Sequence, residues 1–109
     1  MIGYSQLMKD IFNLDKSSVE MQMEKLVKHQ LSKLRFDVLK ELAKQERGTI
    51  SSLLRQVTDN HNGGTYKTIK IFFELLHKDN ILEFEKVGVR RYWKFSDKAK
   101  DLRNYILSS

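Results

Sequence analysis

The sequence predicts a mainly α-helical fold with one small β-hairpin, which belongs to the α+β class. Several stretches of the 109-residue chain repeat apolar residues three and four positions apart, the period of an α-helix with one buried face. Residues 81–95 are instead rich in β-branched and aromatic side chains around a single glycine, which is typical of two strands and a tight turn. The chain length corresponds to one domain with one modest core.

The first thirty residues are expected to form two short helices. Ser5 can cap the first helix. Its apolar face would consist of Leu7, Met8, Ile11 and Phe12. Ser17 and Glu20 have the spacing of a capping box and predict the start of the second helix. The apolar stripe of that helix consists of Val19, Met23, Leu26 and Val27. Both stripes need a partner surface, which is either a second subunit or the chain's own core, with Met21 and Met23 as gap-fillers.

Two more helices precede the hairpin region. The helix predicted over residues 34–45 has a broad apolar side, which consists of Val38, Leu39, Leu42 and Ala43. Gly48 is placed to end this helix, and Thr49 can cap the next one. The inward residues of that next helix are Ile50, Leu53, Leu54 and Val57. Together with the helix that follows Gly64, these two helices are expected to form a three-helix core.

The third of these helices is predicted over residues 65–79, after Gly63-Gly64. Its buried stripe consists of Ile69, Phe72, Phe73 and Leu76. The opposite side carries Lys67, Lys70, Ile71, Glu74 and Lys78. Asp79-Asn80 is expected to stop the helix, because Asn can adopt the left-handed backbone conformation that ends helices.

A hairpin and a last helix follow. The strands are expected over residues 81–86 and 90–95, with the turn at 87–89. The tip and the returning strand carry four cations, which are Lys86, Arg90, Arg91 and Lys94. The last helix is predicted to start at Ser96, a natural cap. Its apolar face consists of Leu102, Tyr105 and Ile106, and it could join the N-terminal helices in a subunit interface.

Roughly residues 32–102 resemble a winged helix-turn-helix DNA-binding domain of the broad MarR, PadR and ArsR kind. In that family a recognition helix ends in a Gly-Leu-Ile-like step, leads into a hairpin called the wing, and is followed by an Arg-Arg-Tyr-Tyr-like phrase. The matching residues here are Asn80-Ile81-Leu82 and Arg90-Arg91-Tyr92-Trp93-Lys94-Phe95-Ser96-Asp97-Lys98-Ala99. Asn80 and Ala99 replace glycines of the family pattern, and the turn over residues 58–64 is longer than usual.

The resemblance implies a domain organisation and a function. Residues 32–109 would form the winged-helix DNA-binding domain with its C-terminal helix, and residues 1–31 a helical extension for dimerisation. A homodimer would bind double-stranded DNA and regulate transcription, with the recognition helix 65–79 in the major groove. The wing 81–95 would lie on the backbone or the minor groove. The alternatives are a winged helix that binds an acidic protein, and a non-specific architectural or RNA-binding protein.

Residue chemistry assigns roles along the presumed recognition helix. Its N-terminal end, where backbone amides favour a phosphate, consists of Thr65, Tyr66, Lys67 and Thr68. Lys67 and Lys70 would project toward the major groove. Ile71 lies nearly opposite the buried stripe, and it either contacts a thymine methyl group or is an ordinary exposed aliphatic residue.

On the wing, Arg90 and Arg91 are the leading candidates for a contact with the backbone or the minor groove. Because neighbouring strand residues point to opposite sides, only one of the two is expected to touch DNA. Trp93 and Phe95 share a side with Arg91 and are expected to lie in the core. The favoured wing contacts are therefore Arg90, Lys86 and Lys94.

The composition favours a polyanionic partner and gives no sign of catalysis. The net charge is +6, and residues 63–96 hold seven Lys or Arg against four acidic residues, a balance of +3. The chain has no Cys, and its three His residues lack metal-ligand spacing, so we expect no metal, cofactor or small-molecule effector. Asp59-Asn60-His61 has the pattern of a turn, and no catalytic motif indicates an enzyme. Without an apolar run long enough for a membrane span, a cytoplasmic protein is expected.

Overall fold

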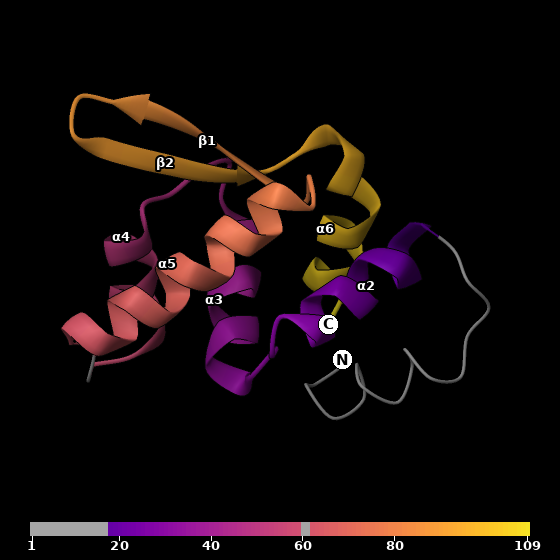
Figure 1. Cartoon of the computed structure of the whole chain (residues 1–109), viewed down its shortest axis with the longest axis horizontal. Coiled ribbons are helices and arrows are strands. Elements are labelled where there is room, and N and C mark those ends of the chain that lie inside the picture. Colours follow the sequence, from indigo (N-terminus) through magenta and orange to yellow (C-terminus); the bar gives the residue numbers. More distant parts are fainter. Residues whose placement is uncertain (1–17, 60–61) are drawn as a thin grey trace.

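The computed structural model describes residues 18–59 and 62–109, which form five α-helices, a short 3₁₀ turn and one two-stranded antiparallel hairpin (Figure 1). In chain order the elements are α2 (Ser18–Lys28), α3 (Lys33–Lys44), α4 (Ile50–Val57), α5 (Gly63–Lys78), β1 (Leu82–Val87), β2 (Arg90–Phe95), η1 (Asp97–Ala99) and α6 (Lys100–Leu107). The predicted α+β class with a small hairpin is confirmed. The first predicted N-terminal helix, with its cap Ser5, and the predicted cap Ser17 lie outside the described residues.

Short polar side chains fix the starts of α4 and α5. The predicted cap of α4 is confirmed, because the Thr49 hydroxyl accepts a hydrogen bond from the N–H three residues later (3.2 Å). Asn62 Oδ1 accepts from the N–H of Thr65 (3.0 Å) and caps α5 in the same way. The helix therefore begins at Gly63 and not at the predicted residue 65, and the connection after α4 shortens to residues 58–62.

The C-terminal ends of α2 and α5 share one geometry and are joined to each other. Gln30 and Asn80 both have a φ of 63°, and in each case the next N–H donates to the carbonyl oxygen five residues earlier (3.1 and 2.9 Å). The predicted left-handed stop at Asn80 is thus confirmed. The preceding residues, His29 and Asp79, hydrogen-bond to each other at 2.5 Å, which holds the end of α2 against the end of α5.

Gly48 does not end α3, contrary to the prediction. The helix ends at Lys44, and Gln45 after it has extended backbone angles. Gly48 instead exchanges two backbone hydrogen bonds with Trp93, with N···O distances of 2.9 and 2.8 Å. A Cβ atom at this position would meet the Oε1 of Gln45 at 3.1 Å and the side chain of Leu53 at 3.4 Å. The glycine therefore fastens the α3–α4 loop to β2.

The hairpin has a tight turn and a continuous register. Leu82 pairs with Phe95 at one end and Val87 with Arg90 at the other. The turn consists of Gly88-Val89, and the φ of 64° at Gly88 is the positive value that two-residue hairpin turns need at their first position. Val87, predicted to lie in the turn, belongs to β1.

The C-terminal helix starts later than predicted. Ser96 makes no side-chain cap bond, and its hydroxyl donates instead to the carbonyl oxygen of Asn80. The chain then passes through η1, and α6 begins at Lys100. The apolar face of α6, with Leu102 and Ile106, is buried, and the helix packs against α2 and α3 of the same chain.

One core unites the helices with the inner face of the hairpin. The predicted stripes of α3, α4 and α5 are buried or half-buried, and Trp93 and Phe95 are buried as predicted. Met23 and Leu26 of α2 belong to this same core, which is the intramolecular alternative expected for that stripe. Met21 is 55% exposed and does not fill the core. A homodimer stays a prediction.

Candidate functional site

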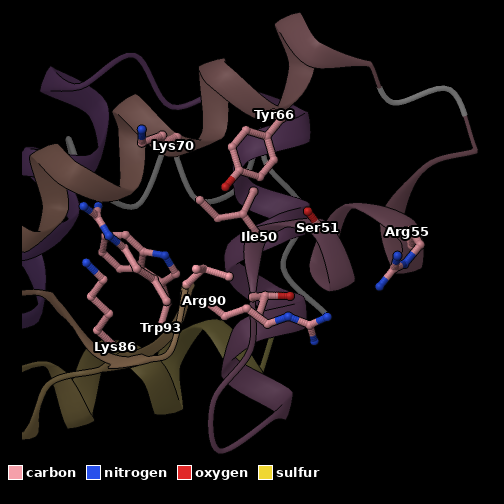
Figure 2. Close-up of a pocket in the computed structure, with 11 residues that line it drawn as sticks. Ile50, Ser51, Arg55, Tyr66, Lys70, Lys86, Arg90 and Trp93 are labelled. Carbon is pink, nitrogen blue, oxygen red and sulfur yellow. The ribbon is translucent and has the colours of Figure 1, made fainter.

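A cleft of about 530 Å³ lies between α5, one side of α4 and the tip of the hairpin (Figure 2). Five cations from these three elements line it, namely Arg55, Lys70, Lys86, Arg90 and Arg91. None of the described side chains that line it is a carboxylate. Ile50 and Trp93 contribute apolar surface, while Ser51 and Tyr66 contribute hydroxyl groups. The cleft is therefore a concave surface of positive charge with hydrogen-bond donors, which suits an anionic ligand.

The predicted binding residues of α5 point in three directions. Tyr66 and Lys70, one helical turn apart, line the cleft. Lys67 is exposed on the outer side of the helix. Thr68 and Ile71 lie on the opposite flank, where they line a second hollow of about 270 Å³. The structure therefore does not bring these five residues together on one surface.

The start of α5 is an exposed helix N-terminus. Gly63 and Gly64 are exposed, and the aligned backbone amides of such a first turn favour an anion. The predicted contact residue Thr65 is already engaged there, because both its N–H (3.0 Å) and its hydroxyl (3.4 Å) donate to Asn62 Oδ1. Thr65 therefore serves the helix cap.

The inner face of the hairpin changes from apolar to basic toward its tip. Phe84 pairs with Trp93 over the core, and the next pair on this face is Lys86 with Arg91. The Arg91 guanidinium lies 4.8 Å from the ring centre of Phe84 and 3.8 Å from a carboxylate oxygen of Glu74 on α5. Arg91 thus shares the core-facing side, as predicted, yet its charge lines the cleft.

At the base of the hairpin, the cations on and beside its outer face are paired with carboxylates. Lys94 Nζ lies 3.2 Å from Glu83, its direct cross-strand partner. Arg47, from the α3–α4 loop, lies 3.1 Å from Glu85 and 4.7 Å from the ring centre of Tyr92. Lys94, predicted among the wing contacts, does not line the cleft.

Sequence reasoning missed the contribution of α4 to this cleft. Ser51 and Arg55 lie four residues apart and therefore on one side of the helix, which carries both of them into the cleft. That polar spacing was present in the sequence. It is informative only together with the tertiary fold, in which α4 and the hairpin line the same cleft.

In the part of the chain that the structure describes, no three His, Cys, Asp or Glu side chains gather to hold a metal ion. No helix within residues 18–59 and 62–109 combines the length and the apolar character needed to cross a membrane. No protein-family model, curated protein or solved structure matches this chain. Its function is therefore inferred from the geometry and charge of the cleft.

Proposed function

We propose that this chain binds double-stranded DNA as a winged helix-turn-helix module. In this proposal α3, α4 and α5 form the trihelical unit, α5 is the recognition helix and β1–β2 is the wing. The observation that carries it is the cleft between α5 and the hairpin, which is lined by five cations and by no carboxylate among the described residues. A surface of this kind neutralises phosphates and releases their counterions.

The dimensions of α5 and of DNA support this binding mode. The major groove is about 12 Å wide and accepts an α-helix, whose diameter with side chains is about 10–12 Å. With the outer side of α5 in the groove, Lys67 would face the base edges. Lys70, Lys86 and Arg90 would then lie against the neighbouring backbone, because they line the cleft beside the helix.

A duplex fits this surface better than an unpaired strand. Proteins that bind single strands stack the bases on exposed aromatic rings. Trp93 is 1% exposed and Phe84 packs against it with ring centres 4.9 Å apart, so both rings serve the core. Among the aromatic residues that line the cleft, Tyr66 alone is substantially exposed.

The biological role extends this proposal. A DNA-binding module of this size, acting as a homodimer on a two-fold site, would regulate transcription. Apolar side chains remain exposed on α2, at Met21, and at the end of α6, at Leu107. They could contribute to a contact between two copies without occupying the cleft, because neither residue lines it.

One observation favours a second candidate function, which is the binding of an acidic protein partner. Val89 at the tip of the hairpin is 97% exposed, and cations flank it on both strands. An exposed apolar side chain surrounded by positive charge would suit an acidic segment with apolar residues.

Fluorescence anisotropy on a random-sequence duplex, across a salt series, tests the DNA-binding proposal. We expect log affinity to fall linearly with log salt, and Lys70→Ala and Arg90→Ala each to lose about 0.9 of that slope. Lys94→Ala is the matched control, because Lys94 is a hairpin cation that is paired with Glu83 outside the cleft. No binding at low salt, or equal slopes for all three variants, would contradict the proposal and favour the acidic protein partner.

A further inference from the structure

The second hollow lies on the flank of α5 that faces away from the hairpin. In Figure 1, α5 runs between the hairpin on one side and the region of α2 and α3 on the other. The hollow has a volume of about 270 Å³ and is formed by α5 together with the turn between α2 and α3. Thr68, which lines it, is about 200° around the helix axis from Tyr66, which lines the cleft. The two concave surfaces therefore flank α5 on opposite sides.

Hydrogen bonds hold the turn between α2 and α3 together and join it to the end of α5. Gln30, in the left-handed conformation, ends α2, and the hydrogen bond between His29 and Asp79 ties the turn to the end of α5. Arg35 Nη1 donates to the carbonyl oxygen of Gln30 (2.8 Å), which closes the turn. One contact, between His29 and Asp79, thus joins this corner to the end of α5, while the other two features fix the corner itself.

This corner places positive charge beside α5. The Arg35 guanidinium lies 5.7 Å from the ring centre of Phe72, and its Nε atom is buried with no hydrogen-bond partner among the described residues. Lys28, at the last turn of α2, is exposed and also lines the hollow. A guanidinium and an exposed ammonium that line one hollow give it positive charge, which favours an anionic ligand.

We infer that this hollow, through Lys28 and Arg35, binds the phosphate backbone of the second DNA strand. The inference rests on the proposed function, in which α5 enters the major groove. That groove is bounded by two phosphate backbones, one from each strand. With the basic cleft against one backbone, the opposite flank of α5 faces the other, and Lys28 and Arg35 lie on that flank. Ile71, 50% exposed beside the hollow, then faces the groove between the two strands.

The inference gives α2 a role that the three-helix unit and the hairpin do not supply. The cleft alone would hold one DNA strand, and α5 could still rotate about that strand. A second cationic contact on the opposite flank fixes the helix across the groove. Lys28 and Arg35 therefore act as positioning contacts, since phosphates carry no base sequence.

The test compares Lys28→Ala with Lys100→Ala, an exposed cation of α6, by anisotropy on a duplex and on a single strand of the same sequence. On the duplex, the slope of log affinity against log salt is expected to be smaller by about 0.9 for Lys28→Ala than for the parent. Between 50 and 200 mM salt, the affinity of Lys28→Ala should therefore fall by a factor about 3- to 4-fold smaller than that of the parent. On the single strand, which has no second backbone, the slope should be unchanged. Lys100→Ala should match the parent on both probes.

The outcomes separate the two proposals. If the parent binds the duplex and Lys70→Ala loses slope while Lys28→Ala does not, the hollow is not a phosphate contact, and the DNA-binding proposal stands. If Lys28→Ala loses the same slope on both probes, the assignment to the second strand is wrong. If the parent shows no salt-dependent binding to the duplex, the proposed function fails, and the hollow loses its role with it. Thermal unfolding of Lys28→Ala should match the parent, because the side chain is exposed.

Discussion

The base and the tip of the β1–β2 hairpin are built from opposite kinds of contact. The base, residues 82–85 with 92–95, packs Trp93 and Phe95 into the core and is joined to Gly48 by two backbone hydrogen bonds. Its one cation, Lys94, contacts Glu83. The tip, residues 86–91, has no acidic residue, and Lys86, Arg90 and Arg91 all line the cleft.

This difference shows how a short hairpin can present charge to a ligand. A two-stranded hairpin is at best marginally stable alone, and concentrated like charges would weaken it further. Here the base supplies the burial and the backbone bridge that hold the hairpin. Its ion pairs leave the excess positive charge at the tip, where Arg91 contacts Glu74 of α5. Apart from Arg91, the tip can therefore be varied with little cost to folding, while the base cannot.

The largest effect is expected from removing the anchor of the base. Trp93 packs against Phe73 and Phe84 at ring-centre distances of 5.3 and 4.9 Å, so Trp93→Ala would leave a cavity under the hairpin. We expect a loss of about 3–5 kcal/mol in the free energy of unfolding, measured by urea titration. Trp93→Phe, which keeps part of the ring volume, should lose clearly less. A loss below about 1 kcal/mol for Trp93→Ala would mean that the base does not anchor the hairpin.

The apolar stripes of the helices and the hairpin itself could be predicted because they follow from local periodicity. Asn80 and Thr49 could be predicted because each satisfies nearby backbone groups with its own conformation or side chain. Gly48 could not, since a glycine after a helix suits either a helix end or a close backbone approach. The choice depended on Trp93, which is distant in the sequence.

The candidate site was less predictable than the fold, because it is assembled from separate elements. Lys70 and Lys86 were predicted and line one cleft, yet Thr68 and Ile71 lie on the other flank of α5. The pairing of Lys94 with Glu83 follows from the hairpin register. The predicted turn, residues 87–89, was one residue too long, and a turn of that length does not place Lys94 opposite Glu83. The hollow at Lys28 and Arg35 could not be predicted, because it depends on how α2 packs against the rest of the chain, and no local sequence pattern specifies that packing.

A smaller effect should follow from breaking the backbone bridge at the base. Gly48→Pro removes the N–H that donates to the Trp93 carbonyl oxygen (2.9 Å) while leaving the side chains of the base in place. We expect a loss of about 1–2 kcal/mol in the free energy of unfolding, because one buried acceptor loses its donor. Gly48→Ala keeps the N–H and is the matched control. Equal stability of Gly48→Pro and Gly48→Ala would show that the hydrogen bond from the Gly48 N–H adds nothing to the anchor.

The smallest effect on folding is expected at the tip. Val89 is 97% exposed, so Val89→Ser should change the free energy of unfolding by no more than about 0.5 kcal/mol in a urea titration. Its affinity for duplex DNA should also stay close to the parent's, because the salt-dependent part of binding comes from the cations of the cleft. Arg90→Ala, at the other side of the same tip, should leave stability equally unchanged but weaken DNA binding. If Val89→Ser weakens DNA binding as much as Arg90→Ala, apolar contact contributes to recognition and the tip does not act through charge alone.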